Sequence, residues 1–142
     1  MATPDELRAA IAEARDALAA ALEAAKAGDW EKEPGTGEGE AAWSARATAE
    51  HVVGAEAFFT NAICTACGYP GVEFANRSYA NAGEASAALA EVIELTNKKL
   101  KYVTETDLPN KHDRFGSVEG LMATQAGHAR DHAAQIRAAA GV

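Results

Sequence analysis

His128 and His132 have the spacing that most directly suggests chemistry. They lie four residues apart in GHARDHAAQIRAA, residues 127–139, whose alanine content favours a helix. On a helix this spacing places both imidazoles on one face, with Cβ atoms roughly 5–6 Å apart. Two imidazoles at that separation can bind one metal ion, or they can be two ordinary polar residues. The pair alone leaves both interpretations open.

A helical wheel places more polar side chains on the same face, which we expect to be buried because charged residues occupy the opposite face. A buried polar group without a partner costs about 1–3 kcal/mol, so several of them on one stripe need a common explanation. A metal ion with attached waters provides one. The residues within about 40° of His128 at helical spacing are Leu121, Thr124, His132, Gln135 and Ala139.

His51 is the candidate for a third ligand, because small residues on its helix face leave space around the imidazole. It lies roughly 10 Å from the start of its helix, whereas His128 and His132 lie roughly 16–23 Å into theirs. The three side chains can meet only if the two helices are staggered or run antiparallel.

Three other metal motifs are excluded by residue type. A zincin has Glu directly after its first histidine, where this chain has Ala129. The inverted motif has Glu where this chain has Asp131, and a ferritin-like site needs two Glu-x-x-His pairs. What remains is a mononuclear three-histidine site with open coordination positions, which is typical of catalytic sites.

Helix signals predict an all-α four-helix bundle that forms a single domain over residues 1–142. Alanine is abundant and no strand pattern is apparent. The segment 28–42, rich in Gly and Glu, is predicted to be a mobile acidic loop, and Tyr69, Phe74 and Tyr79 are expected to pack over the bundle. The first helix is expected to begin at Pro4 after the cap Thr3, and the other three near the caps Ser44, Asn81 and Ser117. Their expected ends are at Gly28, near Cys67, near Thr106 and near Ala140.

Composition restricts the partners. The 142 residues carry a formal charge of −8 with dispersed basic residues, which argues against nucleic acid. No segment resembles a membrane span or a signal peptide, so a cytoplasmic location is expected.

Cys64 and Cys67 form a Cys-x-x-Cys motif, but no strand precedes them as in thioredoxin-type motifs. They lie roughly 20–24 Å beyond His51 along a continuous helix. Packing at the helix end is the expected role, with a reversible disulfide as the alternative.

Two segments resemble the DinB-like superfamily. AWSARATAEHVVGAEAFF, residues 42–59, has a tryptophan, a capping serine and His51 eight residues after the tryptophan. GSVEGLMATQAGHARDHAAQIRAA, residues 116–139, has a Ser-Val helix start, the His-x-x-Asp-His pair and a following Gln-Ile. The resemblance extends over essentially residues 5–140.

The superfamily includes mycothiol- and bacillithiol-dependent S-transferases and a maleylpyruvate isomerase. The resemblance implies a bundle with a long crossover between the second and third helices, which suits residues 68–81. It also implies a divalent metal ion, most often zinc or nickel, held by His51, His128 and His132, and a homodimer in many members.

Three neutral imidazoles leave a zinc ion its full charge, so a bound thiol or water is deprotonated near neutral pH. We therefore expect a metal-dependent S-transferase or isomerase that acts on a small molecule with a low-molecular-weight thiol. The alternatives are a metal-dependent hydrolase, a non-enzymatic metal- or ligand-binding bundle, and a catalytically silent helical protein that associates with itself or with a partner. Candidates for contacts to the ligands or to a substrate are Thr48, Gln125, Asp131 and Gln135, and His112 is expected at the surface.

Overall fold

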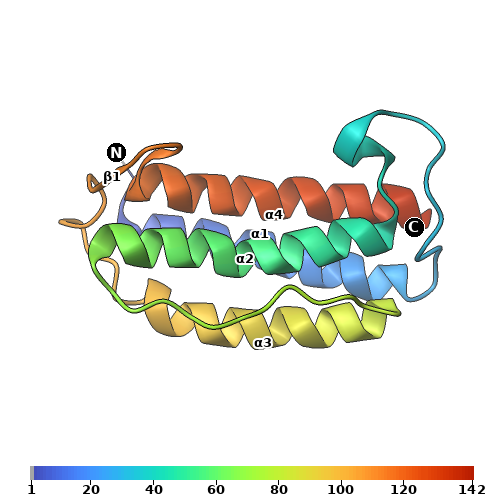
Figure 1. Ribbon diagram of the computed structural model, residues 1–142, viewed down its shortest axis with the longest axis horizontal. Coiled ribbons are helices and arrows are strands. Elements are labelled where there is room, and N and C mark those ends of the chain that lie inside the picture. Colours follow the sequence, from blue (N-terminus) through green and yellow to red (C-terminus); the bar gives the residue numbers. More distant parts are fainter. Residues whose placement is uncertain (1) are drawn as a thin grey trace.

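Four long helices lie side by side in the computed structural model, which describes residues 2–142 (Figure 1). The chain is an all-α four-helix bundle, as predicted. The elements are α1 (Pro4–Ala25), the 3₁₀ helix η1 (Gly39–Ala42), α2 (Ala45–Cys67), α3 (Ala82–Leu100), β1 (Lys111–His112), β2 (Gly116–Ser117) and α4 (Val118–Ala140).

The four helix starts are fixed by side-chain caps, which confirms their prediction. Thr3 accepts a hydrogen bond from the backbone N–H of Glu6, whose side chain in turn accepts from the backbone N–H of Thr3. Ser44, Asn81 and Ser117 each accept from the backbone N–H three residues later. Each cap satisfies a donor that the helix itself cannot pair.

The prediction that Gly28 ends the first helix was wrong, because α1 ends at Ala25. Gly28 instead allows a close approach of two backbones. A Cβ at this position would lie 2.3 Å from the carbonyl oxygen of Ala140, and that oxygen accepts a hydrogen bond from the Asp29 N–H at 3.0 Å.

The third helix is also shorter than predicted and ends at Leu100 rather than near Thr106. After Leu100 the N–H groups of Tyr102 and Val103 bond to carbonyl oxygens three residues back, so the chain leaves the α-helix through a tighter turn. The Arg8 guanidinium on α1 holds this turn by donating to the carbonyl oxygens of Leu100 and Val103 at 3.1 and 2.8 Å.

The connection between α2 and α3 runs the length of the bundle, so α2 and α3 point the same way and α4 points the opposite way (Figure 1). This is the long crossover implied by the resemblance. Tyr79 is buried beneath Trp30, whose Nε1–H donates to the Tyr79 carbonyl oxygen at 2.9 Å, while Phe74 is half-buried. The antiparallel arrangement of α2 and α4 places the first half of α2 beside the second half of α4.

A buried polar network joins all four helices inside an otherwise apolar core. Arg15, on α1, forms a salt bridge with Glu56, on α2, with 2.6 Å between Nε and Oε1. Both side chains are at most 3% exposed. The other members that bond to this pair or to one another are Thr60, Thr96, Asn97 and Gln125.

The loop between α3 and α4 contains a short antiparallel hairpin in which His112 pairs with Gly116. The sequence had not predicted any strand, and two residues per strand are too few to give an alternating pattern. Over the described residues, no helix is both long and apolar enough to cross a membrane.

Candidate metal centre

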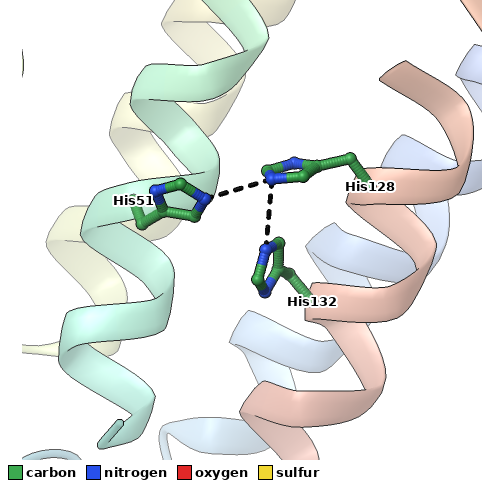
Figure 2. A group of neighbouring side chains, drawn as sticks. All are labelled: His51, His128 and His132. Carbon is green, nitrogen blue, oxygen red and sulfur yellow. Dashed lines mark hydrogen bonds between the residues drawn. The ribbon is translucent and has the colours of Figure 1, made fainter. Parts of the chain in front are cut away.

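Three imidazoles from two antiparallel helices converge at one point. His51 projects from α2, and His128 and His132 project from α4 (Figure 2). The Nε2 atom of His128 lies 3.1 Å from Nε2 of His51 and 3.1 Å from Nε2 of His132. One ring nitrogen from each histidine lies within 4.8 Å of the others, so the antiparallel helices bring together the three residues that the sequence singled out.

Two of the three separations between the ring nitrogens, those that involve His128, fit nitrogens that share one metal ion. Zinc–nitrogen bonds of about 2.0–2.1 Å place two ligand nitrogens about 2.9 Å apart at a right angle and about 3.3–3.4 Å apart at the tetrahedral angle. The two separations of 3.1 Å fall between these limits. Over residues 2–142, these three histidines are the one cluster of potential metal ligands, and three protein ligands leave coordination positions open.

Gln135 fixes the orientation of His132. The His132 Nδ1 atom lies 2.8 Å from Oε1 of Gln135, and the Gln135 Nε2 group donates to the backbone carbonyl oxygen of Glu40. Because the amide nitrogen is committed to a carbonyl, Oε1 can only accept, so Nδ1 of His132 carries the proton. The lone pair of His132 is then on Nε2, which faces the other two histidines. Hydrogen bonds of this kind orient metal ligands in many proteins.

Burial keeps His51 and His128 neutral. Burial lowers the pKa of His51, and the nearby His132 lowers it further. The pKa of His128 falls to about 4, chiefly through burial and then through repulsion by His132 and His51. Neutral imidazole is the form that binds a metal. The rings of Trp43 and Phe59 pack against His51 and His128, with centroids 5.2 and 5.3 Å apart respectively.

Two of the three histidines face a pocket of about 800 Å³. His51 and His128 lie on its wall beside Phe58, Phe59 and Phe115. Charged side chains also line this pocket. A cavity of this size can hold a small organic molecule. The arrangement therefore joins a three-nitrogen donor set to a space for a substrate.

The predicted buried face of α4 is rotated in the structure. The buried stripe of this helix is centred roughly 90° from His128 on a wheel of 100° per residue, and it runs through Met122, Ala129 and Ile136. Apolar side chains compete for the core, so His128 and Gln135 lie half-buried at its edge. This position exposes the His128 imidazole to the pocket, while His132 stays buried.

The other three candidate contact residues lie elsewhere. Thr48 is buried, and its hydroxyl donates to the Ser44 carbonyl oxygen at 2.9 Å. Gln125 belongs to the buried network, where its amide nitrogen lies 3.3 Å from Oε1 of Glu56. Asp131 is exposed on α4. The structure brings only Gln135, of the four, against a histidine of the cluster.

Two residues of the site were missed in the sequence. The Glu40 carboxylate lies 3.8 Å from Nε2 of His132, and Arg114 lines the pocket. Glu40 lies in the four-residue 3₁₀ helix η1 and Arg114 in the turn of the hairpin, and both segments are too short for a periodicity that reveals which way a side chain points. The buried pair Arg15 and Glu56 did leave a signal, because each is a charged residue on an apolar helix stripe.

The two cysteines are free thiols at the far end of α2. Burial raises the pKa of the Cys64 thiol and raises that of Cys67 to about 11. Both are therefore protonated at neutral pH and are poor nucleophiles or ligands.

A four-helix bundle with three convergent histidines at a pocket defines a helical protein with a site that can hold a metal ion. The DinB superfamily model matches residues 10–136, and the chain belongs to this superfamily. No curated protein and no solved structure shows significant similarity to the chain.

Proposed function

We propose that the chain is a divalent-metal-dependent enzyme that transfers a low-molecular-weight thiol to a small electrophile or uses the thiol in an isomerisation. His51, His128 and His132 are the proposed ligands, and zinc or nickel is the proposed metal. The observation that carries the proposal is the convergence of the three histidines, two of which, His51 and His128, lie on the wall of an 800 Å³ pocket.

A divalent metal ion held by these residues supplies a Lewis acid that lowers the pKa of a bound thiol or water toward neutrality. The residues of the chain prepare the site for it. Gln135 keeps the proton of His132 on Nδ1, and burial keeps His51 and His128 neutral. Trp43 and Phe59 exclude water from the sides of two imidazoles.

The transfer forms one bond from the thiol sulfur to an electrophilic carbon and breaks the bond from that carbon to a leaving group. The thiol proton must leave as this occurs. Glu40 has the one carboxylate within 4 Å of a cluster nitrogen among residues 2–142. We assign it as the acceptor of that proton.

The test begins with metal analysis of protein purified without an affinity tag, beside the His51→Ala variant and the His112→Ala control. We expect about one metal ion per chain in the parent and the control and none in His51→Ala. The metal-loaded parent should then consume a thiol in the presence of 1-chloro-2,4-dinitrobenzene. Bound metal without thiol consumption, but with ester hydrolysis, would favour a hydrolase, and metal with neither activity would favour a binding protein.

We also propose a homodimer and a cytoplasmic location. Alanine-rich helix faces allow close approach of two helices, and the cytosol keeps low-molecular-weight thiols reduced. Light scattering at micromolar concentration tests the first part, since a monomeric mass would contradict it.

A further inference from the structure

Two arginines line the pocket beside the histidines, and only one of them forms a salt bridge. Arg77 forms a salt bridge with Glu91, with 2.5 Å between Nη2 and Oε2, and lies over the Phe74 ring. Arg114 also lines the pocket, but within residues 2–142 its guanidinium has no salt bridge. Arg114 is thus an exposed cation on the pocket wall with no carboxylate bonded to it among these residues.

The hairpin holds the backbone of Arg114 in place. The ring nitrogen Nδ1 of His112 accepts hydrogen bonds from the backbone N–H groups of Arg114 and Phe115, both at 3.2 Å. Gly116, with φ at +81°, completes the turn in a backbone conformation that other residues rarely adopt. His112, expected only at the surface, is half-buried and organises this turn.

An apolar wall joins Arg114 to the histidine cluster. The Arg114 guanidinium carbon lies 5.0 Å from the Phe115 ring centroid. The Phe115 centroid lies 5.5 Å from that of Phe59, which lies 5.3 Å from that of His128. A ligand along this wall would meet a cation at one end, aromatic rings in the middle and the imidazoles at the other end.

The acidic groups of the pocket leave the charge of Arg114 unopposed. The Glu50 carboxylate is held by Arg46 at 3.0 Å and by the Tyr79 N–H at 2.9 Å. Glu40 lies at the opposite end, beside His132.

We propose that Arg114 binds the carboxylate of an acceptor substrate whose apolar body lies along Phe115 and Phe59. The planar guanidinium pairs with a carboxylate through two parallel hydrogen bonds, and the aromatic wall selects an apolar rather than a polar body. The proposal rests on the proposed function only in placing the reacting end of the substrate at the histidines.

The test uses chelator-treated protein, because a carboxylate can also bind a metal ion directly. The probes are biphenyl-4-carboxylate and its neutral amide, and the measurement is the dissociation constant from calorimetry or from NMR shifts. We expect the parent to bind the acid at least ten times more tightly than the amide. Arg114→Gln should bind the two equally, since only the charged contact distinguishes them.

Lys111→Gln is the matched control, because it removes the same charge from the same hairpin at a residue that does not line the pocket. It should keep the preference for the acid. The proposal is overturned if the parent binds no acid, if Arg114→Gln keeps the preference, or if both variants lose it equally. Binding of glutathione that depends on Arg114, with no binding of biphenyl-4-carboxylate, would also overturn it, because the arginine would then serve the thiol.

These measurements need neither metal nor turnover. Acid binding that depends on Arg114 in a protein without thiol-transfer activity would contradict the proposed function alone. Thiol-transfer activity without that binding would contradict the role of Arg114 alone. Circular dichroism of Arg114→Gln checks that the variant is folded.

Discussion

The side chain of Gln135 connects His132 to the loop before α2. Its Oε1 lies 2.8 Å from Nδ1 of His132, and its amide nitrogen donates to the Glu40 carbonyl oxygen. The loop thereby determines which nitrogen of His132 carries the proton. Residues 95 positions apart in the sequence are joined at the centre of the candidate site.

Replacing Gln135 should weaken metal binding without removing a ligand. In Gln135→Leu the His132 ring loses its fixed orientation, and we expect zinc affinity to fall 10- to 100-fold, as for other partners of metal-bound histidines. Competition with a chromophoric chelator measures the affinity. Asp131→Asn, an exposed change one residue from His132, should leave it unchanged. Equal affinities in the parent and Gln135→Leu would show that the hydrogen bond does not serve the metal.

The cysteines should be dispensable for metal binding. Cys64 and Cys67 lie 13 and 16 residues beyond His51 in the continuous helix α2, which is roughly 20–24 Å along its axis. Their raised thiol pKa values also keep them protonated at neutral pH. We expect the variant with both cysteines changed to serine to retain about one metal ion per chain by elemental analysis. A folded but metal-free double variant would refute a site made by histidines alone.

Helix starts could be predicted from sequence because the cap is a local device. Thr3, Ser44, Asn81 and Ser117 each bond to a backbone N–H within three residues, so no other part of the fold is needed. The turn at the end of α3 is held instead by Arg8, 92 residues away from Leu100. Such a contact has no signature in the segment that it holds.

The same distinction between local and long-range contacts applies to the candidate site. His128 and His132 share a helix, so their spacing predicts their proximity. Their approach to His51 requires the antiparallel pairing of α2 and α4, which spacing leaves open. Glu40 and Arg114 lie outside the four long helices, in η1 and in the hairpin turn, where side-chain direction depends on contacts such as those of Gln135 and His112.

Replacements of Arg15 and Glu56, which form the buried salt bridge, should have strongly coupled effects on the free energy of unfolding. Removing one partner leaves a buried charge unpaired, so Arg15→Met is expected to lower the free energy of unfolding by about 3–5 kcal/mol. The double variant with Glu56→Met removes both charges. Its free energy of unfolding should therefore fall by much less than the sum of the decreases in the two single variants. Urea denaturation of the four proteins in a double-mutant cycle measures the coupling. Additive losses would mean that the two side chains do not stabilise each other.

Metal binding should stabilise the folded state, and this stabilisation should require His132 but not a histidine outside the cluster. A ligand that binds only the folded state stabilises it by about 2.7 kcal/mol at a hundredfold excess over Kd. We expect a chelator to lower the melting temperature of the parent at pH 7.5 and to leave that of His132→Ala unchanged. His112→Ala removes a histidine outside the cluster and should keep the chelator response. If the parent and His132→Ala respond alike, the three imidazoles are ordinary polar residues.

The metal-free protein should lose stability as the pH falls from about 6.5 toward 4. The pKa of His128 is about 4 in the folded state, against 6.5 for an unperturbed histidine, and the pKa of His51 is lowered too. Within this window the unfolded chain binds protons that the folded chain does not, so the free energy of unfolding decreases as the pH is lowered. The contribution is present above pH 6.5 and lost as the pH approaches 4.

Urea denaturation of the chelator-treated parent and of His128→Gln at several pH values measures this effect. The variant lacks the titrating imidazole, so its stability should fall less steeply across the window, while carboxylates contribute equally to both proteins. Parallel curves for the two proteins would show that His128 is as free to bind a proton in the folded state as in the unfolded one. The metal-loaded parent should show the steepest fall, because protons there also compete with the metal for the same nitrogens.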